Sequence, residues 1–150
     1  MYKKILVAFD GSDGSVTATK AASELAGLTG AGLVVMFAYE QPAFYGAMLG
    51  GGAINGVESI DPRLFDDCRA AREATVRGIL DASLTGVNTR YKYRVEVGPP
   101  AATVAQVAEE EKCDLIVVGS RGLGGVQLFL LGSVSERIAH LAHCSVLIVR

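Results

Sequence analysis

Five short segments of the chain are rich in apolar residues and predict β-strands. Two of them, Lys3–Phe9 and Gly32–Tyr39, are near-continuous hydrophobic runs, which are typical of strands covered on both faces, and Asp114–Val118 is also interpreted as a buried strand. The segment Tyr91–Val97 instead alternates polar and apolar residues, which indicates a strand near a sheet edge with one wetter face. The five predicted strands are Lys3–Phe9, Gly32–Tyr39, Tyr91–Val97, Asp114–Val118 and Ser145–Val149.

Apolar residues recur at helical spacing between these strands and predict four helices. The first helix is expected to stop at Gly30, and the second to run from about Asp61, where an Asp-Pro pair favours a helix start, to Thr85. The apolar stripes are Ala18, Ala21, Ala22, Leu25 and Leu28 in the first helix; Phe65, Cys68, Val76 and Ile79 in the second, interrupted by Arg72; Val104, Val107 and Ala108 in the third, after Pro99 and Pro100; and Val134, Ile138 and Leu141 in the fourth.

Strands alternate with helices throughout, which predicts an α/β fold with helices on both faces of a five-stranded, mainly parallel, doubly wound sheet. A length of 150 residues fits a single domain over residues 1–150. The stretch from Glu40 to Ile60 is irregular, with Pro42 and three glycines at Gly50–Gly52, and predicts a loop or lid.

Composition narrows the class of protein further. A formal net charge of -2 and the absence of any Lys/Arg-rich run argue against a nucleic-acid partner. The first apolar run ends at Asp10 and is too short for a membrane span or a signal-peptide core, so we expect a cytoplasmic protein with no membrane partner. The three cysteines, Cys68, Cys113 and Cys144, are expected to be buried, reduced thiols.

Two loops carry the candidate chemistry. Asp10-Gly11-Ser12 follows the first strand, and the glycine-rich segment Gly119–Leu131 follows the fourth. Ligands of doubly wound sheets bind beyond the carboxyl ends of the strands, so an order of 2-1-3-4-5 or 3-2-1-4-5 would bring both loops to one crevice. Main-chain amides of such a loop and of the next helix start form an anion site, which predicts phosphate binding.

The standard phosphate motifs do not fit this loop. A Walker A motif needs Gly-Lys-Ser/Thr, which is absent from the chain. The dinucleotide fingerprint also fails, because Gly122-Leu-Gly124 is not followed by the third glycine and lies after the wrong strand. The pattern that is present is Gly119-x2-Gly122-x9-Gly132-Ser133.

This pattern resembles the G-x2-G-x9-G-[ST] signature of the ATP-binding branch of the universal stress proteins. The resemblance runs end to end, through KKILVAFDGS at the start, CDLIVVGSRG, and LLGSVSERIAHLAHCSVLIVR at the end. It implies strand order 3-2-1-4-5, ATP with Mg2+ or Mn2+ as the cofactor, a stress-response role, and a homodimer through the last strand, residues 145–149.

The resemblance also implies roles for individual residues. Asp10 would meet the ribose or adenine, and Ala38 the base. Arg121 is the nearest cation, because the nine-residue insert 123–131 has no basic residue. The implied nucleotide-binding residues are Asp10, Ala38, Val118, Gly119, Arg121, Gly122, Gly132, Ser133, Val134 and Ser135.

Several of these residues also have a simpler structural interpretation that does not involve a ligand. Asp10 could only form an Asx-turn with the glycine that follows it, and Ser133 with Glu136 matches a helix capping box. Arg121 could be a solvated loop residue. His140 and His143, three apart on the predicted fourth helix, are interpreted as cations near its C-terminus rather than metal ligands.

Three functions are consistent with the sequence. The first is a regulatory ATP-binding protein with little or no catalysis, since no base is evident to activate water. The second is a slow ATPase or phosphohydrolase, although Ser12 stands where aspartyl phosphatases need a second carboxylate. The third is an adaptor or structural module that binds no nucleotide.

Overall fold

The computed structural model describes residues 1–41, 63–86, 89–120 and 132–150. Most of the predicted loop at 40–60 and the predicted helix start at Asp61-Pro62 lie outside these residues. The strands are β1 (Lys4–Ala8), β2 (Gly32–Tyr39), β3 (Tyr91–Val97), β4 (Leu115–Gly119) and β5 (Ser145–Val149), and the helices are α1 (Asp13–Thr29), α3 (Arg63–Ser83), α4 (Pro100–Glu110) and α5 (Ser133–Leu141).

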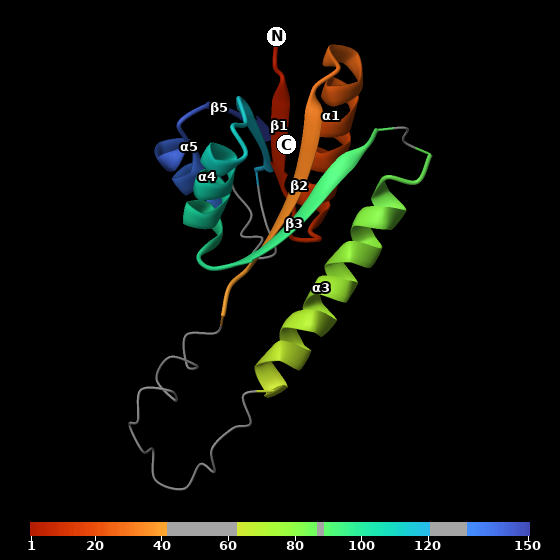
Figure 1. Cartoon of the computed structure of the whole chain (residues 1–150), viewed down its shortest axis with the longest axis vertical. Helices are drawn as coiled ribbons and strands as arrows, with labels where there is room; N and C mark the ends of the chain where they lie inside the picture. Colours follow the sequence, from red (N-terminus) through yellow and green to blue (C-terminus); the bar gives the residue numbers. More distant parts are fainter. Residues whose placement is uncertain (42–62, 87–88, 121–131) are drawn as a thin grey trace, which may run out of the picture.

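The five strands form one parallel sheet in the order β3-β2-β1-β4-β5 (Figure 1). This confirms the predicted order 3-2-1-4-5. The central strand β1 pairs with β2 through Val7 and Val35 and with β4 through Val7 and Val117. The carboxyl ends of β2, β1 and β4 therefore lie side by side at one edge of the sheet.

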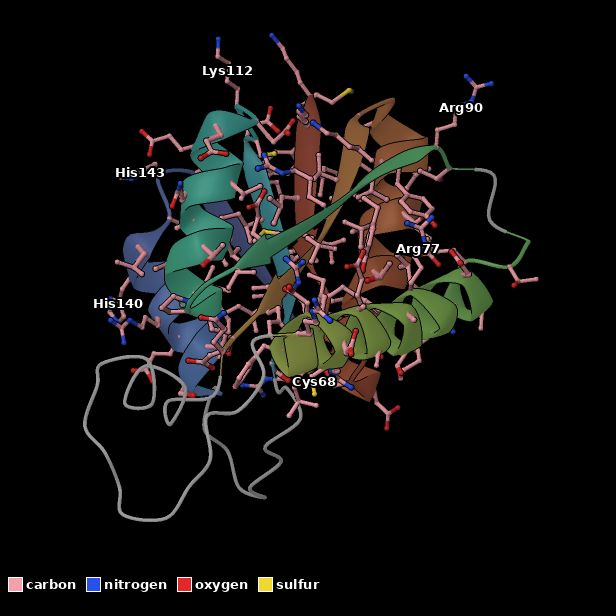
Figure 2. All side chains as sticks on the ribbon, turned by 60° about the horizontal axis from the view of Figure 1, so that its bottom comes forward. Cys68, Arg77, Arg90, Lys112, His140 and His143 are labelled. Carbon is pink, nitrogen blue, oxygen red and sulfur yellow. The ribbon has the colours of Figure 1, made fainter. Side chains whose placement is uncertain are left out.

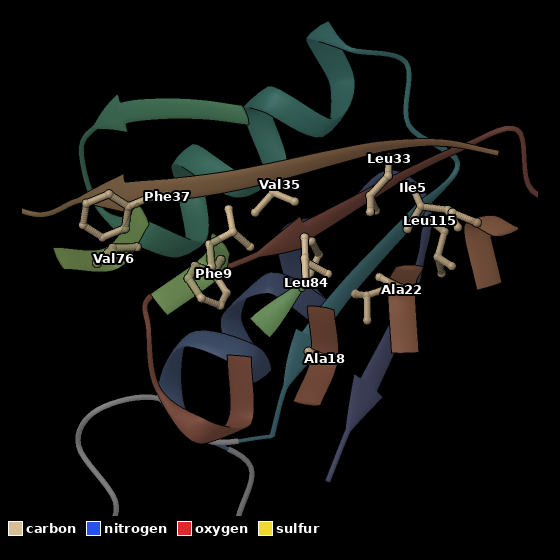
Figure 3. Close-up of a cluster of buried hydrophobic side chains, with 14 residues drawn as sticks. Ile5, Phe9, Ala18, Ala22, Leu33, Val35, Phe37, Val76, Leu84 and Leu115 are labelled. Atoms are coloured by element: carbon tan, nitrogen blue, oxygen red, sulfur yellow. The ribbon is translucent and has the colours of Figure 1, made fainter. Parts of the chain in front are cut away.

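The helices cover both faces of the sheet, as the α/β/α prediction requires. On one face, α1 and α3 pack against side chains such as Val7 and Val35, and Figure 3 shows Phe9, Phe37 and Val76 gathered there. On the opposite face, α4 and α5 cover a second apolar cluster that includes Ile138. The near-continuous apolar runs of the central strands reflect burial on both faces.

Both ends of α1 are defined by local chemistry. The Oγ atom of Ser12 caps the helix by accepting a hydrogen bond from the amide of Ser15 at 3.3 Å. At the other end Gly30 adopts a left-handed conformation with φ 70°, and its amide donates to the carbonyl of Ala26. The predicted stop at Gly30 is confirmed.

The predicted apolar stripe of α3 is only partly correct. Val76 and Leu80 are buried, but Cys68 is exposed (Figure 2). The first turns of α3 lie beyond the ends of the strands in Figure 1, so a helical stripe there has no sheet to cover. The expectation that all three cysteines are buried is therefore wrong for Cys68, whereas Cys113 is buried and burial raises the pKa of its thiol to about 11.

The helix α5 also departs from its predicted pattern. Ile138 is fully buried, but Val134 and Leu141 are about 40% exposed. The helix ends at Leu141, so His143 lies outside it and the two histidines do not share a helix. His140 is in the last turn, as predicted, and the Nε2 atom of His143 lies 3.7 Å from a Glu109 carboxylate oxygen.

A group of ion pairs ties the end of α4 to the sheet. The Glu111 carboxylate accepts hydrogen bonds from Lys4 Nζ at 2.6 Å, Lys92 Nζ at 2.5 Å and Arg94 Nη1 at 3.1 Å. These donors lower the pKa of Glu111 to about 2, with Lys4 the largest cause. The Glu111 side chain is only 10% exposed, but Lys92 is 59% exposed, so the bond from Lys92 is open to water and the other two are partly buried.

Candidate functional site

The loop between β1 and α1 holds the Asp10 carboxylate in a fixed orientation. Its Oδ1 atom accepts hydrogen bonds from the amide of Ser12 at 2.9 Å and from the Ser12 hydroxyl at 2.5 Å. The Asx-turn interpretation of Asp10 is therefore correct for its local geometry. Among the described residues, both of these donors bind Oδ1 and none donates to Oδ2.

The Ser12 hydroxyl connects the Asp10 side chain to the start of α1. Its hydroxyl hydrogen points to Asp10, and its lone pairs accept the Ser15 amide at the start of α1. The amide of Gly11 donates to the Ser15 hydroxyl at 3.1 Å, which closes the turn. The orientation of the Asp10 side chain is therefore coupled to the first turn of α1.

The end of β4 is joined directly to the start of α5. The amide of Ser120 donates to the carbonyl of Val149 at 2.7 Å, and the carbonyl of Ser120 accepts from the amide of Gly132 at 2.8 Å. The glycine-rich segment between Ser120 and Gly132 lies outside the described residues, and Arg121 and Gly122 lie within it. These hydrogen bonds place the start of α5 at the carboxyl end of β4.

The start of α5 has no side-chain cap in the part of the chain that the structure describes. Its N-cap residue is Gly132, so Ser133 is the first helical residue and is exposed. The predicted capping box of Ser133 and Glu136 is wrong, because the helix begins one residue earlier than the box needs. The Ser135 hydroxyl turns back to donate to the carbonyl of Gly132 at 2.8 Å.

The start of α5 presents main-chain donors at the carboxyl end of β4. The amides of the first turn have no acceptor within their own helix, and the helix dipole gives them a partial positive charge. Ser133 and Val134 are exposed, so their main chain can be approached from solvent. A phosphate group is a good chemical match for such a set of donors.

Gly119 has a structural requirement that does not depend on a ligand. A Cβ atom at this position would lie 2.6 Å from both the carbonyl carbon and the oxygen of Gly14 in α1. A glycine is therefore needed so that α1 can cross the end of β4. From the sequence, Gly119 is interpreted as a residue that lets the main chain approach a phosphate. The sequence does not show that α1 packs against this position.

The other predicted site residues lie at the same edge of the sheet. Ala38 is near the carboxyl end of β2, and a hydrogen bond of 2.8 Å from the amide of Phe9 to the carbonyl of Met36 holds β1 beside it. Val118 is 6% exposed and its side chain belongs to the core under α4 and α5.

Arg72 is a residue of this region that the sequence analysis did not assign to the site. Its Nη2 atom donates to the main-chain carbonyl of Asp10 at 2.9 Å, across 62 positions of sequence. In the sequence, the only indication of this role is that Arg72 interrupts the apolar stripe of α3. A charged residue that faces inward from such a stripe needs a polar partner. The stripe alone does not identify that partner.

The described residues contain no cluster of three or more His, Cys, Asp or Glu side chains arranged to hold a metal ion. None of their helices has the length and apolar character required to cross a membrane.

Comparison with known proteins identifies the family. The chain matches the universal stress protein family over residues 1–150. A universal stress protein of Thermus aquaticus is 39% identical over 150 residues, and universal stress protein YxiE of Bacillus subtilis is 34% identical over 155 residues, each pair covering 100% of both chains. A universal stress protein solved in complex with cAMP has 29% identity and a TM-score of 0.69, covering 99% of this chain and 97% of that one. The chain belongs to the universal stress protein family.

Proposed function

We propose that this universal stress protein binds ATP at the carboxyl edge of its sheet, with Mg2+ or Mn2+ on the phosphates. The observation that carries the proposal is the start of α5, which follows the end of β4, has no side-chain cap and has the exposed residues Ser133 and Val134 in its first turn. Such a helix start favours an anionic ligand. The pattern Gly119-x2-Gly122-x9-Gly132-Ser133 spans the same two elements.

The residues around this helix start suit the rest of an adenine nucleotide. Asp10 keeps one carboxylate oxygen without a described partner, and a carboxylate is a good acceptor for ribose hydroxyls. Ala38, at the neighbouring strand end, would contact the base. The related universal stress protein that was solved in complex with cAMP supports an adenine nucleotide as the ligand class.

The proposed role is regulatory and cytoplasmic, with little or no catalysis. In it, the amides of Ser133, Val134 and Ser135 hold the phosphates and Arg121 adds a cation. Gly119, Gly122 and Gly132 have no side chains to obstruct the approach of the phosphates to the main chain. A bound divalent ion would supply further neutralisation of the phosphate charge. The nucleotide then changes the state of the protein rather than being turned over.

We also propose a homodimer through β5. This strand is at the edge of the sheet, and Leu147 on it is 41% exposed. A strand edge with unpaired main-chain groups is a surface on which a second strand can pair. A second copy of the chain would cover both the edge and this leucine.

Mass spectrometry of small molecules released from the purified, denatured protein tests the nucleotide proposal. We expect an adenine nucleotide, and expect calorimetry of the stripped protein to show heat of binding for ATP with Mg2+. The variant Gly122→Glu should lose this heat while keeping wild-type thermal stability, because it puts a carboxylate where phosphate binds. A nucleotide-free protein with no ATP heat would support the adaptor role instead.

A further inference from the structure

One face of α3 contacts the loop that carries Asp10. Arg72, Val76 and Ile79 are spaced by four and three residues, so they lie along the same side of the helix. The guanidinium of Arg72 binds the carbonyl of Asp10. A Cβ atom at Gly11 would lie 3.1 Å from Ile79 Cδ1 and 3.7 Å from a methyl group of Val76.

This contact restricts the main chain of the loop. Gly11 has φ +83°, a conformation that residues with side chains rarely adopt. The peptide between Asp10 and Gly11 is held at its carbonyl by Arg72, and the peptide between Gly11 and Ser12 leads into the cap of α1. The loop is thus fixed from α3 on one side and from α1 on the other.

Arg72 differs from the other arginines of α3 whose ion pairs the structure describes. Arg69 pairs with Asp66 and Arg77 with Asp81, whereas no described carboxylate lies within ion-pair distance of the Arg72 guanidinium. Its hydrogen bond joins a charged donor to a neutral carbonyl and is partly buried. Bonds of this class are stronger than those between neutral groups.

We propose that Arg72 is a positioning residue for adenine-nucleotide binding, because its bond to the Asp10 carbonyl holds the Asp10 carboxylate where the nucleotide meets it. The inference rests on the proposed function. Ser12 sets the side-chain orientation of Asp10, and Arg72 sets the main chain from which that side chain extends. Arg72 therefore acts through Asp10 and not by touching the phosphates.

The test compares Arg72→Met with Arg77→Met. Arg77 is on the same helix (Figure 2), and its guanidinium lies over the Tyr93 ring, 4.5 Å from the ring centroid. In Arg72→Met the Asp10 loop is no longer held in place before binding, and the cost of ordering it then predicts about a tenfold higher Kd for ATP with Mg2+. Arg77→Met should bind like wild type, and Arg72→Lys, which keeps a cationic donor, should recover part of the loss.

Two further measurements separate positioning from other roles. In an Asp10→Ala background, Arg72→Met should weaken ATP binding by less than twofold, because the residue through which it acts is gone. In the wild-type background, Arg72→Met should weaken adenosine and ATP by the same factor. A loss for ATP alone would show a direct phosphate contact. Effects of Arg72 and Asp10 that simply add would show that Arg72 acts independently of Asp10, and either result would overturn the inference.

The failure of the inference and the failure of the proposed function give different results. A wild-type protein that binds no adenine nucleotide rejects both. A wild-type protein that binds ATP, with Arg72→Met binding equally well, rejects the inference alone. Equal losses in Arg72→Met and Arg77→Met would also reject it, since the effect would then come from general loosening of α3.

Discussion

Replacing Gly119 with alanine tests whether this glycine is required by the fold. The added Cβ atom would lie 2.6 Å from the carbonyl carbon and oxygen of Gly14, and 3.1 Å from its Cα atom. Non-bonded carbon atoms are at their optimal separation at about 3.5–4.0 Å. Either α1 or β4 must therefore move by roughly 1 Å to admit the methyl group.

The loss of stability in Gly119→Ala depends on how far the main chains of β4 and α1 can move apart. Gly119 is the last residue of a buried strand, and Gly14 is main chain in the first turn of α1, so neither can give way by rotating a side chain. Overpacking of a well-packed interior costs about 1–3 kcal/mol. We expect Gly119→Ala to fall at the upper end of this range.

Urea unfolding followed by circular dichroism measures the difference in the free energy of unfolding between Gly119→Ala and wild type. Gly27→Ala is the matched control, because Gly27 is exposed on the same helix with nothing within 4 Å of the added atom. Alanine there should stabilise the protein by about 0.5–1 kcal/mol. A Gly119→Ala protein as stable as wild type in the absence of nucleotide would refute the close packing of α1 on β4.

Three further changes have defined outcomes. Glu111→Gln should lower the free energy of unfolding by about 1–3 kcal/mol at pH 7 in urea titrations. The difference from wild type should disappear as pH falls from 4.5 to about 2, because the lowered pKa of Glu111 stabilises the fold only while its carboxyl group is ionised. Ser12→Ala should lower the free energy of unfolding by about 1 kcal/mol through loss of the α1 cap, and should also weaken ATP binding in calorimetry. Unchanged affinity for ATP would show that Ser12 does not contribute to nucleotide binding. Leu147→Lys should shift sedimentation from dimer to monomer, whereas an unchanged dimer would place the interface elsewhere.

The central strands β1, β2 and β4 were predictable from the sequence because burial on both faces makes them almost uniformly apolar, whereas β3 was predictable from its alternation of polar and apolar residues. The bounds of β2, β3 and β5 match the predicted segments, and Gly30 ends α1 as expected. The order of the strands depended on a family resemblance, since apolar runs carry no information about which strand lies beside which.

The errors have a common physical origin. A helical stripe shows which face is apolar but not where the sheet beneath it ends, so Cys68 was placed inside although it is exposed. The packing partner of Gly119 and the hydrogen-bond partner of Arg72 are distant in sequence, and no local pattern identifies them. Ser133 fits a capping box by residue type, but Gly132 occupies the N-cap position.

Titration of the 15N-labelled protein with ATP and Mg2+ tests the central claim most directly. The proposal of a phosphate site at the start of α5 predicts saturable shifts of the amide signals of Ser133, Val134 and Ser135, accompanied by Gly11 in the loop held by Arg72. A spectrum that does not change, or shifts confined to amides far from the carboxyl edge of the sheet, would contradict it.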